Sequence, residues 1–279
     1  MIIVDFQQVM ISNLMAQIGN HTNIQIEESL FRHMVINSLR GYRTKFKDYG
    51  EMVIACDDKN FWRRQVFPYY KANRKKARDK SELDWTTIFE YFGKLKAEIR
   101  ENFPYRMIQI DTAEADDIIA TLVVEFSEDR TEEIVILSGD KDFIQLHRYP
   151  NVKQYDPVRK KMIHSDDPNR YLFEHILKGD AGDGVPNILS DDDTFVTDKR
   201  QKPMTQKKMD EFFFDRSAIA MQRNWNRNQQ LIDLGFIPQD IRKAVIDKYH
   251  EEGGKDRSKL FNYFISYKLK NMMESVGDF

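Results

Sequence analysis

Short apolar runs alternate with longer amphipathic stretches over the first two thirds of the chain. The apolar runs are rich in Ile, Val and Met and are too short for helices, which predicts buried strands at 1–5, 51–56, 105–110, 134–137 and 152–155. Apolar residues recur at helical spacing between them, which predicts helices at 6–18, 26–45, 82–101, 117–126 and 171–178, with a polar loop at 19–23. This alternation predicts an α/β fold with a mostly parallel central sheet flanked by helices.

The last hundred residues have a different pattern. A glycine-rich turn at 179–188 is followed by no further strand pattern, and helices are expected at 205–221, 225–234, 238–250 and 257–275. We therefore predict two parts, an α/β domain over 1–178 and a helical C-terminal domain over 179–279.

Acidic residues follow the ends of four predicted strands. They are Asp5, Asp57, the cluster Glu114, Asp116 and Asp117, and the pair Asp140 and Asp142. The carboxyl ends of parallel strands form the ligand-binding edge of an open α/β sheet. Two unit charges about 4 Å apart repel by about 4 kcal/mol at an effective dielectric near 20, so such a group favours bound Mg²⁺ or Mn²⁺. A single Asp would instead indicate a turn or a helix cap, and Asp117 fits a cap best.

A basic stretch follows the second strand. Residues 59–80, here called the basic arch, hold nine Lys or Arg residues and one acid, which gives a net charge of +8 with aromatic residues interleaved. Basic side chains neutralise phosphates and aromatic faces stack on unpaired bases. The predicted nucleic-acid contacts are Arg63, Arg64, Tyr69, Tyr70, Lys71, Arg74, Lys75, Lys76 and Arg78. The alternative is a solvated basic helix anchored by its aromatic residues.

Composition excludes several classes of protein. The 279 residues carry a formal net charge of −2 and a single cysteine, Cys56, so no disulfide framework forms within the chain, as in a reducing cytosol. No run approaches 18 apolar residues, and the N-terminus enters a strand pattern without a secretion signal. No glycine-rich loop ends in Gly-Lys-Ser/Thr, which argues against a P-loop NTPase.

The acids and the basic arch together favour metal-assisted phosphodiester hydrolysis. Two divalent ions about 4 Å apart can activate water and stabilise the attacking and leaving oxygens, while a Lys or Arg neutralises charge on the phosphate. Asp180 and Asp183 stand three apart in the glycine-rich turn, a spacing that suits a ligand pair or a polar loop equally. The six histidines, His175 among them, show no metal-ligand spacing.

These motifs resemble the 5′-nuclease (flap endonuclease) superfamily. The resemblance is carried by Asp5, Asp57, Glu114-Ala-Asp116-Asp117, Ser-Gly-Asp140-Lys-Asp142, Gly-Asp180-Ala-Gly-Asp183 and the arch segment 67–74. Within that superfamily, segments 62–64, 145–147 and 149–154 are similar to the ribonuclease H branch of T-even bacteriophages. The resemblance implies a PIN-like 5′-nuclease fold and a phage-encoded 5′→3′ exonuclease and flap endonuclease. Such an enzyme removes RNA primers from the lagging strand in the host cytoplasm.

The resemblance also implies roles for individual residues. Asp5, Asp57, Glu114 and Asp116 would hold one Mg²⁺, and Asp140, Asp142, Asp180 and Asp183 a second, with Mn²⁺ able to substitute. Asp116 could bridge the two ions, and Asp117, in the same acidic cluster, is also predicted as a metal-site residue. The helical domain over 179–279 would serve nucleic-acid and partner binding. Lys71 and Arg74 would contact the scissile phosphate or the threading strand.

The resemblance further implies a monomer that binds DNA and RNA–DNA hybrids. It also implies interactions with a single-stranded DNA-binding protein and with a sliding clamp. The apolar end 276–279 could dock on such a clamp, or it could be a frayed terminus. One departure concerns residues 184–193, which lack the glycine-punctuated helix-hairpin-helix that grips duplex DNA in this superfamily.

Two other functions fit parts of the pattern. A phosphatase or a topoisomerase-primase-type site would use the Asp140-Lys-Asp142 pair without needing Asp5, Asp57 and the basic arch together. A non-catalytic nucleic-acid-binding protein with an acidic ion site would gain little from repelling its polyanionic ligand with eight acids.

Overall fold

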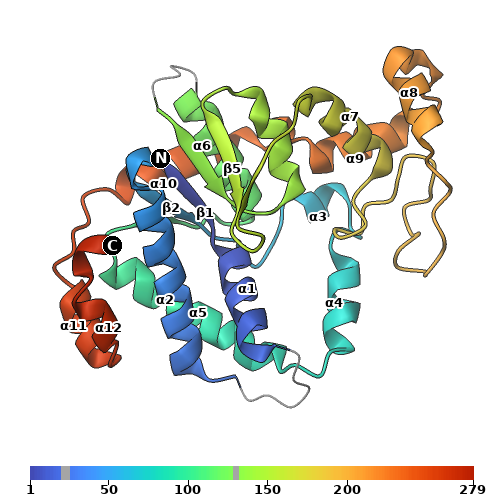
Figure 1. Ribbon diagram of the computed structural model, residues 1–279. Helices are drawn as coiled ribbons and strands as arrows, with labels where there is room; N and C mark the ends of the chain where they lie inside the picture. Colours follow the sequence, from blue (N-terminus) through green and yellow to red (C-terminus); the bar gives the residue numbers. More distant parts are fainter. Residues whose placement is uncertain (20–25, 128–131) are drawn as a thin grey trace.

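A six-stranded sheet forms the centre of the protein, which is described by a computed structural model over residues 1–19, 26–127 and 132–279 (Figure 1). Most of the predicted loop at 19–23 lies outside these ranges. In spatial order β3-β2-β1-β4-β5-β6, the strands are β3 Arg106–Ile108, β2 Met52–Ala55, β1 Ile2–Asp5, β4 Ile134–Leu137, β5 Val152–Asp156 and β6 Lys161–Ile163. The first five are parallel, as predicted, and β6 pairs antiparallel with β5.

Strand β6 was not predicted from the sequence. It is three residues long, and two of its three side chains are exposed, so it leaves no apolar run in the sequence. Its ladder partner β5 supplies the burial at this edge of the sheet.

The two faces of the sheet are covered by different helices. Alternate strand residues such as Val4 and Ile54 pack with α1 (Phe6–Ile18), α2 (Glu28–Lys45) and α5 (Trp85–Asn102). The intervening residues, such as Ile3 and Val53, pack with α6 (Ala115–Ser127), α10 (Gln239–Glu251) and the 3₁₀ segment η2 (Lys141–Arg148). Both faces are therefore buried, which explains why the strands are continuous apolar runs rather than alternating ones.

The C-terminal third is helical, as predicted, but two of the predicted helices, 205–221 and 257–275, are shorter or broken. The observed helices are α7 Pro168–Lys178, α8 Gln206–Phe214, α9 Gln222–Ile232, α10 Gln239–Glu251, α11 Leu260–Ser266 and α12 Lys270–Met273. The helix predicted at 205–221 ends at Phe214, because the Asp215 carboxylate accepts from Ser217 N and starts a new turn. The helix predicted at 257–275 is broken at Lys268, whose φ is 56°.

The last helices share the hydrophobic core of the sheet. Residues of α10 pack against α6 and the sheet, and α11 and α12 lie beside α5 (Figure 1). Phe279 is 1% exposed and packs against Phe103 and Phe264, so a frayed terminus is wrong and its ring is not free to dock on a clamp. Residues of α10, α11 and α12 thus belong to the same core as the α/β part. The predicted domain boundary at residue 178 therefore stays a prediction.

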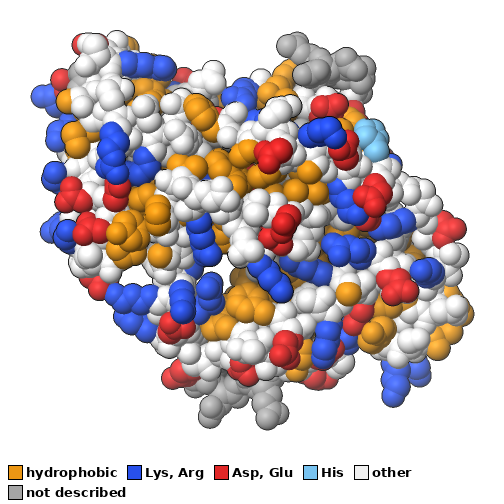
Figure 2. All heavy atoms as spheres, turned by 180° about the vertical axis from the view of Figure 1, so that it is seen from behind, with side chains coloured by type: hydrophobic (Ala, Val, Ile, Leu, Met, Phe, Trp, Pro, Cys, Tyr) orange, Lys and Arg blue, Asp and Glu red, His pale blue; other side chains and the backbone are white. Residues whose placement is uncertain are grey.

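The basic arch forms two short helices, α3 (Arg63–Val66) and α4 (Ala72–Asp79), separated at Pro68. Helix α4 stands away from the sheet, opposite α1 (Figure 1). On the other face of the molecule, Lys and Arg side chains gather on the α4 side, next to a hollow (Figure 2). None of the helices in the described ranges combines the length and apolar character needed to cross a bilayer.

Candidate metal and nucleic-acid site

The predicted acids meet at the carboxyl edge of the sheet because β1 lies between β2 and β4. Asp5 is the last residue of β1 and Asp57 follows β2 by two residues. The Asp57 carboxylate accepts from Ala115 N at 2.7 Å and so holds the start of α6, which carries Asp116 in its first turn. Asp140 follows β4 and caps η2 by accepting from Asp142 N at 2.9 Å.

Asp5 is the buried centre of this group. Its side chain accepts from Ser138 Oγ at 2.9 Å and from Gln8 N at 3.1 Å. Burial, and then the nearby carboxylates of Asp57 and Asp140, raise its pKa to about 7. A carboxyl with this pKa is only partly ionised at neutral pH unless a cation compensates.

Two more acids have strongly raised pKa values for the same reason. Burial and the neighbouring Asp140 and Glu114 raise the pKa of Asp116 well above its usual range. Burial, Asp140 and Asp180 do the same for Asp142. The acids that follow β1 and β4 and begin α6 therefore lie close enough to one another and to the glycine-rich turn to repel. Such a group of neighbouring carboxylates is typical of a cation site.

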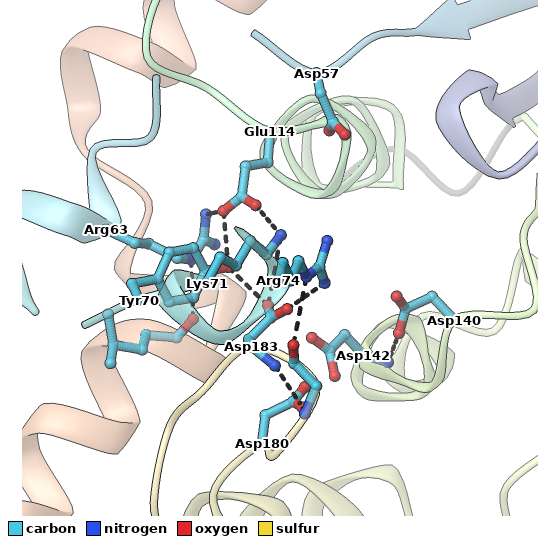
Figure 3. Close-up of polar contacts among 12 residues, drawn as sticks. Asp57, Arg63, Tyr70, Lys71, Arg74, Glu114, Asp140, Asp142, Asp180 and Asp183 are labelled. Atoms are coloured by element: carbon cyan, nitrogen blue, oxygen red, sulfur yellow. Dashed lines mark hydrogen bonds and ion pairs between the residues drawn. The ribbon is translucent and has the colours of Figure 1, made fainter. Parts of the chain in front are cut away.

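The glycine-rich turn brings Asp180 and Asp183 to this edge. Gly179 has φ 67°, and a Cβ there would lie 2.4 Å from the backbone oxygen of Val185, so only glycine fits. The chain then turns tightly, with Asp180 accepting from Gly182 N at 2.7 Å. Asp142, Asp180 and Asp183 lie close together in Figure 3, with Asp140 beside Asp142.

His175 was not expected in the site, yet its ring lies between two of the acids. Its Nδ1 is 3.3 Å from the Asp142 carboxylate and its Nε2 is 3.9 Å from that of Asp180. Burial lowers its pKa, partly offset by Asp180 and Asp140. The only signal in the sequence was its place in the last turn of a helix that ends at the glycine-rich turn.

Arg63, predicted to contact nucleic acid, is buried at 3% exposure. Its guanidinium lies 2.8 Å from both the Glu114 and the Asp117 carboxylates and donates to Leu231 O at 2.9 Å. Asp117 is fully buried and also accepts from Trp62 Nε1 at 3.0 Å and from Glu114 N at 2.9 Å. Arg63 therefore forms a buried structural ion pair with Glu114 and Asp117. Asp117 fixes the start of α6 through Glu114 N and holds Trp62 and Arg63 against it.

Three further arch residues bind acids of the site (Figure 3). The Tyr70 hydroxyl lies 2.9 Å from Glu114 and 2.8 Å from Asp183, and it is 3% exposed, so it is not free to stack on a base. Lys71 is paired with Glu114 and lies 3.5 Å from Asp183. Arg74 is paired with Asp183. Burial opposes ionisation of Asp183, but Lys71 and Arg74 outweigh it and lower its pKa.

The remaining predicted contacts lie on the outside of the arch. Arg64, Tyr69, Lys75 and Lys76 are exposed and Arg78 is half-buried. Lys76 pairs with Asp198, while the start of α4 is fixed to the glycine-rich turn by Lys71 N donating to Asp183 O at 2.7 Å. The arch is therefore held against the acidic edge and presents positive charge to solvent beside it.

Known proteins are similar to this chain over nearly its whole length. A family model described as the 5′-3′ exonuclease, N-terminal resolvase-like domain, matches residues 2–172, and one described as T4 RNase H, C terminal, matches residues 167–279. The ribonuclease H of Enterobacteria phage T4 is 34% identical over 99% of this chain and 95% of its own length. The flap endonuclease Xni of Shewanella sp. (strain MR-4) is 30% identical over 49% of this chain and 51% of its own length.

Solved structures agree with the fold. The bacteriophage T5 D15 flap endonuclease, in a pseudo-enzyme–product complex with DNA and metal ions, aligns with a TM-score of 0.63 over 90% of this chain and 98% of its own, at 18% identity. The T5 D15 protein co-crystallised with metal ions aligns with a TM-score of 0.62 over 91% of this chain and 99% of its own, also at 18% identity. This chain therefore belongs to the 5′–3′ exonuclease family of hydrolases, nucleases that include the flap endonucleases and the phage T4 ribonuclease H.

Proposed function

We propose that the protein is a two-metal-ion 5′→3′ nuclease that hydrolyses phosphodiester bonds of RNA–DNA hybrid, duplex and flap substrates. Its task would be to remove RNA primers during phage lagging-strand replication, and the phage T4 relative carries the name ribonuclease H. The observation that carries the proposal is the meeting of acids from β1, β2, β4, α6 and the glycine-rich turn, with raised pKa values at Asp5, Asp116 and Asp142.

The donor set fits hard divalent cations. Carboxylate oxygens are the ligands that Mg²⁺ and Mn²⁺ prefer, and several buried like charges need such a counter-charge. We assign Asp5, Asp57, Glu114 and Asp116 to one ion and Asp140, Asp142, Asp180 and Asp183 to a second, with Asp116 near both. Ions held there would activate water and stabilise charge on the attacking and leaving oxygens.

The chain's own residues position the substrate. Lys71 and Arg74 sit between Glu114 and Asp183 at the base of the arch. Once bound cations share the charge of these acids, the Lys71 ammonium and the Arg74 guanidinium would be available to a phosphate oxygen. Exposed Lys75 and Lys76 would contact phosphates further along the strand.

The partners proposed for this chain are DNA and RNA–DNA hybrids. One solved structure of the same fold, that of the T5 D15 flap endonuclease, contains DNA and metal ions, and the arch offers the positive charge that a nucleic-acid backbone requires. A single-stranded DNA-binding protein and a sliding clamp stay predictions that follow from the family resemblance alone.

The proposal is tested with Asp140→Asn, which keeps the shape of an exposed side chain at the centre of the acidic edge. We expect loss of Mg²⁺-dependent cleavage of a 5′ flap while binding of the flap survives. Full Mg²⁺-dependent activity in this variant would reject the proposal. Asp166→Asn is the matched control, because its carboxylate is fully exposed and pairs with His164 rather than with the acids of the site.

The substrate distinguishes this proposal from a phosphatase. We expect wild type to cleave a 5′ flap and an RNA–DNA hybrid and to leave a free phosphomonoester unchanged. Turnover of the monoester with no cleavage of the flap would favour a phosphatase. Salt-sensitive binding without any product under Mg²⁺ or Mn²⁺ would favour a non-catalytic binder.

A further inference from the structure

The last turn of α7 places an imidazole inside the acidic site. His175 is three residues from the end of α7, and Asp180 follows the Gly179 cap, so both side chains come from one helix end. Asp142 approaches from η2, the segment that α7 packs against. One ligand atom from each of His175, Asp142 and Asp180 lies within 4.8 Å of the other two.

These separations suit a single ion. Metal–ligand bonds of about 2.1 Å put ligands on opposite sides of an octahedral ion about 4.2 Å apart and adjacent ligands closer. At least two of the three pairs would be adjacent, at about 3.0 Å, so atoms that now lie within 4.8 Å of one another would close by up to about 1.8 Å to share one cation. The negative end of the α7 dipole also favours a positive charge at this position.

The surroundings hold the imidazole in place. The His175 ring packs edge-on against Tyr171, one turn earlier in α7, with ring centroids 5.8 Å apart, and its side chain is 15% exposed. Each ring nitrogen faces a different carboxylate. One nitrogen can therefore offer its lone pair to an ion, while the other donates to one carboxylate oxygen and leaves the second oxygen of that acid for the ion.

We propose that His175 is a ligand of the second cation site, with Asp142 and Asp180, and that its nitrogen makes this site bind Mn²⁺ and Co²⁺ in preference to Mg²⁺. This assignment rests on the proposed two-metal function and refines one of its two sites. Imidazole suits first-row transition ions, whereas Mg²⁺ prefers oxygen ligands alone. An all-carboxylate site, by contrast, would bind Mg²⁺ and Mn²⁺ through the same kind of ligand.

The test measures metal binding by the full-length protein without nucleic acid. Mn²⁺ is titrated by electron paramagnetic resonance and Mg²⁺ by calorimetry, for wild type and His175→Ala. We expect the variant to lose at least about ten-fold in Mn²⁺ affinity at one site, with a smaller loss for Mg²⁺. Pulsed resonance on Mn²⁺-loaded wild type should show coupling to a ¹⁴N nucleus that is absent in His175→Ala.

The matched control is His164→Ala, because His164 lies 3.1 Å from Asp166 in an exposed imidazole–carboxylate pair away from the cluster. It should bind both ions as wild type does. Absence of nitrogen coupling in wild type, or equal losses of Mn²⁺ and Mg²⁺ affinity in His175→Ala, would overturn the proposal. The wild-type measurement needs no variant, so a folding defect cannot obscure it. Failure here leaves the nuclease proposal standing, because that depends on the cleavage assay with Asp140→Asn.

Discussion

Replacing the buried acid Asp5 with Asn should stabilise the metal-free protein while it abolishes activity. Asp5 is 7% exposed, and burial together with Asp57 and Asp140 raises its pKa from 3.8 to about 7. The folded state then holds a proton on Asp5 more tightly than the unfolded state does. Stability of the metal-free protein must therefore fall as pH rises from about 4 to about 7, and stay low above that.

The size of the effect follows from the pKa. At 1.36 kcal/mol for each tenfold change in the ionisation constant, ionising Asp5 above pH 7 costs about 4 kcal/mol in the folded state. Asn has the same shape and no charge, so it avoids this cost. Asn keeps one oxygen for the hydrogen bonds from Ser138 and Gln8, and a weakened bond offsets about 1 kcal/mol. We expect Asp5→Asn to be more stable by about 1–3 kcal/mol at pH 8.

The assay is urea unfolding with a chelator present, at pH 5 and at pH 8. The advantage of Asp5→Asn should be large at pH 8 and shrink toward pH 5, and added Mg²⁺ should stabilise wild type more than the variant. Asp58→Asn is the control: partial burial opposes ionisation of Asp58, but backbone donors such as Thr112 N together outweigh it and lower the pKa, so removal of the charge should cost stability at pH 8. If Asp5→Asn were less stable than wild type at pH 8 without metal, the electrostatic reasoning would be wrong.

Four other variants test other parts of the structure. Phe279→Ala should lower the free energy of unfolding in urea by about 3 kcal/mol, because it empties a core position. An unchanged free energy of unfolding would favour a frayed terminus instead. Gly179→Ala should cut flap cleavage about ten-fold or more by displacing the glycine-rich turn, with wild-type rates as the contradicting result. Arg63→Met should cost about 3 kcal/mol of stability and leave the salt dependence of DNA binding unchanged. Lys75→Ala should leave stability unchanged and reduce the slope of the logarithm of the DNA-binding constant against the logarithm of salt concentration by about one. Equal slopes for Arg63→Met and Lys75→Ala would refute a structural role for Arg63 and a phosphate contact for Lys75.

Most of the acidic edge was predictable because it depends on local rules. Continuous apolar runs predict buried parallel strands, and in such a sheet all carboxyl ends meet at one edge. Asp5, Asp57 and Asp140 therefore had to be neighbours once β1 lay between β2 and β4. Edge strand β6 escaped prediction because an edge strand with two exposed residues has no apolar signature.

The basic arch shows where composition fails. A run of Lys and Arg predicts phosphate contacts, but composition does not say which of its members turn inward. Arg63 and Lys71 are buried against Glu114, whereas Lys75 and Lys76 face solvent. The difference depends on acids at least 40 residues further along the chain, so only the folded structure separates structural cations from those free to bind nucleic acid.

The sequence by itself determined the class of fold, the strand ends that carry acids and the net positive charge of the arch, because these follow from short-range periodicity and residue type. The tertiary structure alone decided that Asp117 pairs with Arg63, that Phe279 enters the core and that His175 lies between Asp142 and Asp180. The pairs Asp117–Arg63, Phe279–Phe103 and Asp142–His175 each join segments distant in sequence. Their geometry depends on how helices pack on the sheet, and periodicity does not encode that packing.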